Sequence, residues 1–210
     1  MLTTLLGGVA MPAGELAMIA NVAPQTASSH LSKLVSGKLL AVEQQGRHRY
    51  YRLADSEVAH AIEALLAIAP TNVRALQTAR GAYTAAGNLT YARSCYSHLA
   101  GSLAVQIADA LLAREIVIPK ANKLYAVTKP GRQWFNKLGI SIADRDLTDL
   151  RFARRCLDWT ERRHHIAGRL GSAIFSRLRE LRWVAPVRDS RAVRVTLEGQ
   201  RKLTELLGVR

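Results

Sequence analysis

Apolar residues recur at helical spacing in two neighbouring segments near the start of the chain. They are Leu16, Ile19 and Ala20 in the first segment and Ala27, Leu31, Leu34 and Val35 in the second. Pro24 suits the first turn of the second helix, where a missing N–H costs nothing, and Gly37 suits its end. The pattern therefore predicts two short helices joined by a tight turn, each with one face to bury.

Two strand-like runs follow the second helix. They span 39–44 and 47–53, separated by Gln45 and Gly46, which are typical of a hairpin turn. Cationic side chains gather at and beyond the predicted tip: Arg47, His48, Arg49 and Arg52. Cations at this place can neutralise phosphates or enter the minor groove of a duplex. The segments together predict a winged helix-turn-helix domain.

The second helix carries small polar side chains opposite its apolar stripe. Its candidate contacts are Gln25, Thr26, Ser28, Ser29, His30 and Lys33. Such groups can reach base edges in the major groove without a bulky or acidic obstruction. An ordinary solvated helix face is the alternative, which the basic hairpin disfavours. We therefore predict that these six residues, with Arg47, His48 and Arg49, contact double-stranded DNA.

The segment LAMIANVAPQTASSHLSKLVSGKLLAVEQQGRHRYYRLA resembles the ArsR-type bacterial repressors, most specifically in TASSHL and in the wing GRHRYYRL. The resemblance implies a homodimer that binds an inverted-repeat operator. It also implies release of that operator when a small-molecule or metal inducer binds or a thiol is modified. Members of the family commonly begin one helix earlier than Met1, so the leading helix is expected either to be absent or to precede this start.

The metal ligands familiar in that family are incomplete in the predicted DNA-binding domain. Its arsenic and lead sensors carry Cys-x-Cys in the helix before the turn, where this chain has LAMIANV. Its zinc and cobalt sensors carry paired ligands along the helix after the wing, where this chain offers only Asp55, His60 and Glu63. The resemblance therefore places any sensing site in the C-terminal half.

Domain boundaries follow from the next segments. Residues 56–69 form an amphipathic pattern that predicts a helix, capped by Asp55 or Ser56 and stopped by Pro70. In the resembling family the helix at this position packs against its counterpart in the other subunit of the dimer. The alternative is that the helix only completes the hydrophobic core of its own domain. Residues 71–88 are small, polar and weakly periodic, and predict a linker. The sequence thus predicts a DNA-binding domain over 1–70 and a sensor and dimerisation domain over 89–210.

The C-terminal half contains an internal repeat. The stretch from Cys95 aligns with the stretch from His164, which pairs His98 with His165, and the match continues downstream with Thr128 and Thr196. Two winged-helix-like copies, each of helix, strand, turn, strand and helix, are predicted over 89–140 and 150–208. The expected fold class is therefore α+β, mainly α with small β wings.

Composition and charge agree with a nucleic-acid partner. The chain has 210 residues, 49% of them hydrophobic, which is enough for more than one domain, and its formal net charge of +14 favours a polyanion. The arginine-rich second repeat has three interpretations: a solvated face, phosphate contacts beside an operator, or an anionic ligand site. The sequence contains neither a long uncharged apolar stretch nor an export signal, so we expect a cytoplasmic protein with no membrane partner. In that compartment both cysteines are expected to be reduced.

Thiol and imidazole side chains occupy matching parts of the two repeats. The candidate ligands are Cys95, His98, Cys156, His164 and His165. Cys95 and His98 are expected to share a helix face, and packing of the repeats about a pseudo-twofold axis would unite both sets. Sulfur and imidazole together suit zinc or a softer metal ion. A structural role at the repeat junction and a redox or organic-ligand pocket are the alternatives, so the cofactor is left open.

Two other function classes compete with a DNA-binding regulator. A thiol-dependent enzyme would use Cys156 or Cys95 as nucleophile with a histidine base, but the sequence has no glycine-rich phosphate loop and no nucleophile elbow. An RNA-binding protein would present aromatic residues on a sheet, at which only Tyr50 and Tyr51 hint. The sequence therefore favours a non-enzymatic transcriptional regulator, a ligand- or metal-responsive repressor.

Overall fold

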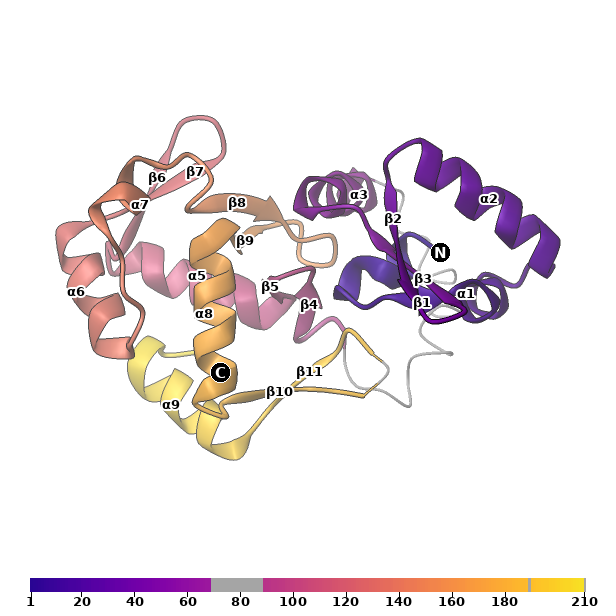
Figure 1. The fold of residues 1–210 in the computed structure, drawn as a ribbon. Coiled ribbons are helices and arrows are strands. Elements are labelled where there is room, and N and C mark those ends of the chain that lie inside the picture. Colours follow the sequence, from indigo (N-terminus) through magenta and orange to yellow (C-terminus); the bar gives the residue numbers. More distant parts are fainter. Residues whose placement is uncertain (69–88, 189, 210) are drawn as a thin grey trace.

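The computed structural model describes residues 1–68, 89–188 and 190–209, which fold into two lobes (Figure 1). The predicted linker 71–88 lies outside the described residues. Helices alternate with short antiparallel strand pairs throughout, so the predicted α+β fold class is confirmed. None of the helices in the described ranges combines the length and apolar character needed to cross a bilayer.

The N-terminal lobe has the predicted helix-turn-helix and wing. Its elements are η1 (Thr3–Gly7), β1 (Met11–Pro12), α1 (Ala13–Ala20), α2 (Pro24–Ser36), β2 (Leu40–Gln45), β3 (His48–Leu53) and α3 (Ser56–Ile68). Gln45 pairs with His48, so the turn consists of Gly46 and Arg47, one residue later than predicted. The Asp55 carboxylate accepts a hydrogen bond from the Val58 N–H at 2.9 Å and so caps α3, as the sequence indicated.

A small hydrophobic core holds these elements together. The helices contribute Leu16 from α1 and Leu31 from α2, and the wing contributes Leu40 and Leu53, all almost completely buried. The core also takes in Leu5 and Leu6 of η1, Ala59 and Ile62 of α3, and partly buried Tyr96 from the other lobe. The apolar stripe of α2 is therefore fixed inward, which turns its polar face to solvent.

The C-terminal lobe repeats one order of elements: hairpin, helix, hairpin, helix. The first copy comprises β4 (Arg93–Cys95), β5 (His98–Ala100), α5 (Ser102–Ala113), β6 (Val117–Lys120), β7 (Leu124–Val127) and α6 (Lys129–Leu138). The second comprises β8 (Arg154–Leu157), β9 (His164–Ala167), α8 (Gly168–Glu180), β10 (Val184–Pro186), β11 (Val193–Val195) and α9 (Leu197–Leu207). Helix α7 (Asp144–Thr148) lies between the copies, and β7 pairs with β8, which joins the copies in one four-stranded sheet.

Aligned residues of the two copies perform the same structural task. Thr128 caps α6 and Thr196 caps α9, each accepting a hydrogen bond at 2.9 Å from the N–H of a glycine three residues later, Gly131 or Gly199. A Cβ atom at either glycine would lie within 2.0 Å of the carbonyl oxygen of the residue that precedes the hairpin. Only glycine fits at this close approach, which explains why both copies carry it.

Each copy begins with a hairpin, where the sequence predicted a helix. The prediction that Cys95 and His98 share a helix face is wrong, because they are the last residue of β4 and the first of β5. The turn between them is only Tyr96 and Ser97, with Tyr96 at a positive φ of 56°. These strands are short and mostly buried, so they carry no alternation of polar and apolar residues from which a strand can be recognised.

Candidate nucleic-acid interface and Cys/His cluster

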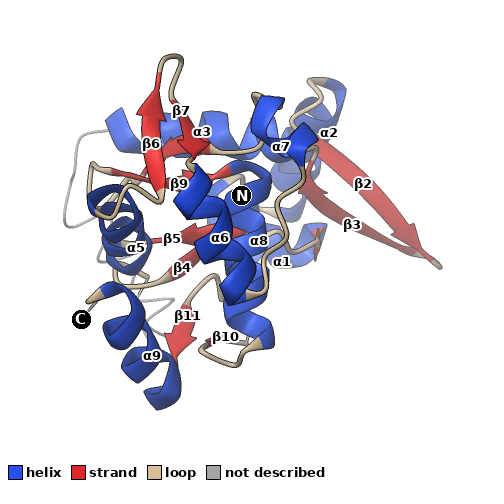
Figure 2. Ribbon diagram, turned by 90° about the vertical axis from the view of Figure 1, so that its left-hand side faces the viewer, coloured by secondary structure: helices blue, strands red, loops and turns tan. Residues whose placement is uncertain are grey.

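The polar face of α2 and the wing tip form the candidate nucleic-acid interface. Figure 2 shows the β2–β3 hairpin projecting from the rest of the molecule. All nine side chains predicted to contact DNA are exposed: Gln25, Thr26, Ser28, Ser29, His30, Lys33, Arg47, His48 and Arg49. The helix thus offers short hydrogen-bonding groups on a surface backed by a packed core, and the wing offers cations on a projecting arm.

Two of the polar side chains in this region are already engaged. The Ser28 hydroxyl donates to the Pro24 carbonyl oxygen at 2.9 Å. Arg52 forms an ion pair with Glu43 across the hairpin and donates to two carbonyl oxygens at the end of β3. Arg52 is therefore held along the wing, while Arg47 and Arg49 lie nearer its tip.

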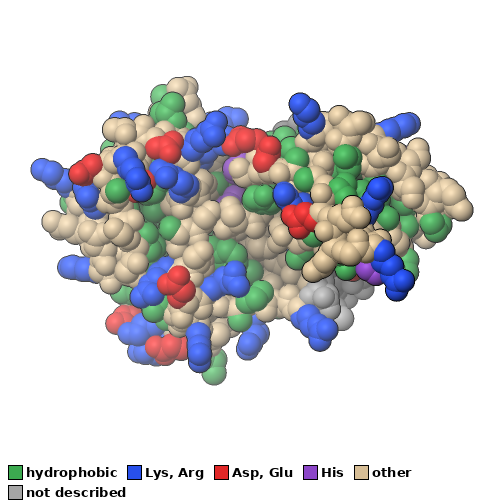
Figure 3. All heavy atoms as spheres, in the orientation of Figure 1, with side chains coloured by type: hydrophobic (Ala, Val, Ile, Leu, Met, Phe, Trp, Pro, Cys, Tyr) green, Lys and Arg blue, Asp and Glu red, His purple; other side chains and the backbone are tan. Residues whose placement is uncertain are grey.

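Several arginines of the second copy are engaged by acidic side chains. On the face drawn in Figure 3, Lys and Arg side chains are spread over both lobes. Several of the arginines pair with carboxylates, namely Arg154 with Glu57, Arg163 with Asp109, Arg169 with Asp146 and Asp149, Arg177 with Glu180, and Arg191 with Glu63. These pairs favour a structural role for those arginines over phosphate contacts.

Two cysteines and two histidines converge in the C-terminal lobe, and we call them the Cys/His cluster: Cys95, His98, Cys156 and His165. Their side chains are buried, and one potential ligand atom from each lies within 4.8 Å of all the others. Cys95 stands directly opposite His98 in the β4–β5 hairpin, and Cys156 stands directly opposite His165 in the β8–β9 hairpin. Opposite residues point to the same side of a hairpin, so each copy supplies one Cys–His pair.

His164 was predicted as a fifth candidate ligand, and the structure leaves it outside the cluster. It pairs with Leu157 on β9, one residue before His165. Successive residues of a strand point to opposite faces, so His164 and His165 cannot both face the cluster. His164 is half-buried, whereas His165 is fully buried.

The donor atoms have an arrangement that suits a bound cation. The Nε2 atoms of His98 and His165 lie 3.1 Å apart. Two nitrogens bound to zinc at about 2.0 Å in tetrahedral geometry lie roughly 3.3 Å apart. The Nδ1 atom of His165 lies 3.3 Å from a carboxylate oxygen of Asp158, which turns Nε2 toward the cluster. A carboxylate behind a ligating imidazole is the usual way to fix its orientation.

Protonation within the cluster also follows from its surroundings. Burial lowers the pKa of His98 to about 4, so this imidazole is neutral at pH 7. A hydrogen bond from the Cys95 thiol holds the pKa of Cys156 far below its ordinary value. Burial opposes a charge on His165, but the neighbouring Asp158 carboxylate and Cys156 sulfur outweigh burial and raise its pKa to about 9. These shifts favour a thiolate at Cys156 and a charged imidazole at His165, and a bound cation would release the His165 proton.

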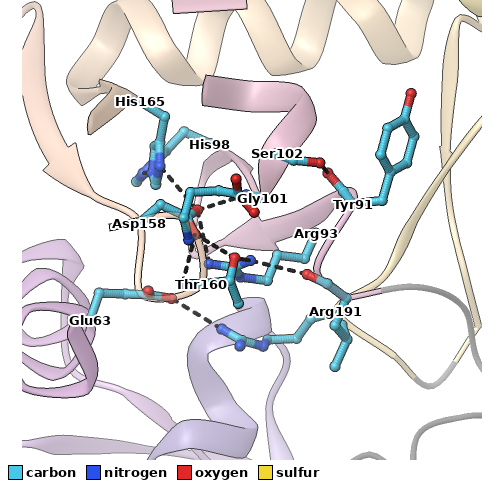
Figure 4. A network of polar contacts seen from close by, with 12 residues as sticks. Glu63, Tyr91, Arg93, His98, Gly101, Ser102, Asp158, Thr160, His165 and Arg191 are labelled. Carbon is cyan, nitrogen blue, oxygen red and sulfur yellow. Dashed lines mark hydrogen bonds and ion pairs between the residues drawn. The ribbon is translucent and has the colours of Figure 1, made fainter. Parts of the chain in front are cut away.

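Asp158 is the centre of the polar network behind the cluster (Figure 4). One carboxylate oxygen accepts from the Arg93 guanidinium at 2.9 Å and from the Gly101 N–H at 2.7 Å. The other accepts from the Thr160 hydroxyl at 2.7 Å and from two backbone N–H groups of its own loop. Asp158 therefore ties the loop between β8 and β9 to β4 and to the start of α5.

The sequence gives no sign that Asp158 has a buried partner, Arg93. Arg93 is completely buried and lies over the Trp159 ring, 4.8 Å from the centroid. A buried arginine cannot be recognised from spacing, because its burial depends on two hairpins that meet only in the fold. The short motif Asp158-x-Thr160 is the one local signal, since Asp commonly accepts bonds from the residues that follow it in a turn.

Asp158→Asn is expected to lower the free energy of unfolding by about 3–5 kcal/mol, because it leaves the buried Arg93 guanidinium without a counter-charge. Chemical denaturation followed by circular dichroism measures this. Asp109→Asn is the matched control, since Asp109 loses only a partly exposed pair with Arg163, worth about 1 kcal/mol or less. Equal losses in the two variants would contradict the central role of Asp158.

Comparison with known proteins identifies a relative that matches along the whole chain. The chain is 45% identical over 210 residues to a protein of Bacillus subtilis (strain 168) described as "Uncharacterized HTH-type transcriptional regulator YdfF". The alignment covers 100% of this chain and 91% of the relative. No family model matches the chain. The similarity thus extends through the C-terminal lobe as well as the helix-turn-helix.

Proposed function

Because the chain belongs to the HTH-type transcriptional regulators, we propose that it is an ArsR-type repressor that binds duplex DNA through α2 and the β2–β3 wing. The observation that carries this proposal is the exposure of all nine predicted contact residues on a helix and a wing that one core holds together. The net charge of +14 supports a polyanionic partner. A homodimer on an inverted-repeat operator is part of the proposal, since paired half-sites match a two-fold axis.

The two parts of the interface have different tasks in this proposal. Gln25, Thr26 and Ser29 lie at the N-terminal half of α2, the end with which recognition helices commonly contact base edges. Arg47 and Arg49, at and just after the wing turn, contact phosphates. The helix therefore determines which sequence is bound, and the wing adds affinity for any sequence.

Arg47→Ala and Arg49→Ala are each expected to weaken binding to every duplex alike, because phosphate contacts carry no sequence information. The slope of the logarithm of the DNA association constant against the logarithm of the salt concentration should fall in magnitude by about 0.9 for each lost phosphate contact. Fluorescence anisotropy at several salt concentrations measures it. Arg201→Ala on α9 is the control, since it removes the same charge far from the wing. A changed sequence preference with unchanged overall affinity would contradict this assignment.

We further propose that the Cys/His cluster binds one zinc-like ion per chain. Four buried protein ligands, two sulfur and two nitrogen, match the set found in closed structural zinc sites. Such a site leaves no open position for substrate, which supports a structural or sensory role and argues against catalysis. The ion would supply a cross-link between the two copies, held by one hairpin from each. The alternatives are a purely structural cluster without an ion and a redox or organic-ligand pocket.

A further inference from the structure

The turn of the β4–β5 hairpin reaches into the DNA-binding lobe. Tyr96 lies between the two ligands Cys95 and His98, and its side chain packs against the N-terminal hydrophobic core. Its backbone N–H donates to the carbonyl oxygen of Leu6 at 2.7 Å. Leu6 is completely buried in the same core as the recognition helix. One residue thus connects the Cys/His cluster with the core that supports α2.

A second connection runs from the other side of Cys95. The Ser94 N–H donates to the carbonyl oxygen of Arg191 at 2.8 Å. The Arg191 guanidinium lies 3.3 Å from a carboxylate oxygen of Glu63 on α3, and both side chains are buried (Figure 4). Both residues next to Cys95 in the chain are therefore linked to the DNA-binding lobe: Tyr96 through Leu6, and Ser94 through Arg191 and its ion pair with Glu63.

The second ligand hairpin also packs on the DNA-binding lobe, with β8 against α3. Its direct ion pair, between Arg154 and Glu57, is partly exposed, and such pairs contribute little in salt solution. The imidazole of His60 on α3 lies near the His98 ring, with ring centroids 5.7 Å apart. Because His98 begins β5, this is another contact between the DNA-binding lobe and the β4–β5 hairpin. The β4–β5 hairpin is thus the better supported route between the lobes.

We infer that the 95–98 hairpin transmits occupancy of the Cys/His cluster to the DNA-binding lobe through Tyr96; the inference rests on the proposed zinc site and the proposed DNA interface. An ion bonded to Cys95 and His98 fixes both ends of the two-residue turn. It thereby fixes the place where Tyr96 enters the core of the other lobe. Coupling between two such sites typically changes affinity by about 5- to 150-fold, and it is reciprocal. Operator DNA therefore changes the zinc affinity by the same factor as zinc changes the operator affinity.

The experiment compares operator dissociation constants for zinc-loaded and zinc-free protein, with zinc content measured on the same samples. The wild type is expected to show a ratio of about 5 to 150. Tyr96→Ala should bind one zinc per chain and show a ratio near 1. Tyr96→Phe is the matched control, because it keeps the aromatic ring that packs against the N-terminal core and should therefore keep the wild-type ratio.

Each outcome assigns the failure to one claim. A wild type that binds no zinc refutes the metal site and this inference with it. If the wild type binds zinc but has the same operator affinity with and without zinc, the metal site is supported and the coupling is refuted. Tyr96→Ala with the full wild-type ratio refutes the route through the hairpin.

A measurement on the unaltered chain decides the matter if Tyr96→Ala does not fold. The Ala27 N–H in α2 donates to the Ala23 carbonyl oxygen at 2.9 Å, and Ala27 is buried, so its amide reports on the recognition helix itself. Zinc is expected to slow amide hydrogen exchange at Ala27 as well as at Tyr96. Slower exchange at Tyr96 with no change at Ala27 would overturn the inference.

Discussion

Ser29→Glu is expected to reduce binding to the specific operator to the level of non-specific DNA, a loss of about a thousandfold or more. Ser29 is exposed near the middle of α2, and the helix packs inward through Ala27 and Leu31 on its other face. A glutamate here places negative charge and added length in the groove while leaving the buried stripe intact. Titration of a labelled operator duplex measures the loss.

The matched control for that substitution is Ser141→Glu. Ser141 is exposed between α6 and α7, so the control adds the same charge to the chain at a place remote from the proposed interface. Its operator affinity should stay close to that of the wild type. Unchanged operator binding by Ser29→Glu would exclude α2 as the recognition helix.

Cys156→Ser is expected to weaken zinc binding by roughly 100- to 1000-fold. Structural zinc sites bind with about 10–16 kcal/mol, and we take each of four ligands to supply roughly a quarter of it. Zinc at a hundredfold excess over its dissociation constant stabilises a protein by about 2.7 kcal/mol, or about 5–10 °C in Tm for a chain of this size. The variant should lose this shift, and operator binding should no longer respond to zinc.

His164→Ala provides the control for the zinc experiment. His164 is adjacent to the ligand His165 in sequence but lies outside the Cys/His cluster. Its zinc stoichiometry and thermal shift should match those of the wild type, as measured by elemental analysis and scanning fluorimetry. A loss of zinc in His164→Ala with retention in Cys156→Ser would reverse the ligand assignment.

The DNA-binding lobe could be predicted from the sequence because its signals are local. Pro24 begins α2, Gly37 follows its last residue, and Gly46 lies in the wing turn at a positive φ of 61°. Each of these residues suits its position because of its own backbone conformation, which proline restricts and glycine leaves free. The segment that packs under them, η1, went unpredicted, because a single short 3₁₀ turn leaves no periodic pattern.

Four of the five predicted candidate ligands form the Cys/His cluster, but the sequence did not predict its geometry. The direct alignment of the repeats paired His98 with His165, yet it could not pair the cysteines. The first hairpin has a turn of two residues between Cys95 and His98, while the second has a longer loop, 158–163, between its strands. Only strand register reveals that both cysteines stand opposite a histidine, and register depends on which strands pair in the fold.

The contacts between the lobes lie beyond what the sequence could indicate. In the sequence, Tyr96 falls within a segment predicted to be helical, and Glu63 falls at a polar position on an amphipathic helix. Glu63 is buried against Arg191, from a segment far away in the chain. Such burial depends on segments that lie far apart in the chain, so no local pattern in the sequence indicates it.

The central claim is sequence-specific recognition of duplex DNA by α2 and the wing, and selection from a random duplex library tests it most directly. The wild type is predicted to enrich an inverted repeat whose half-sites lie one helical turn, about 10–10.5 base pairs, or a multiple of it apart. Ser29→Glu should enrich no motif under the same conditions. Failure of the wild type to enrich any motif, or tighter binding to single-stranded RNA than to every selected duplex, would contradict the account.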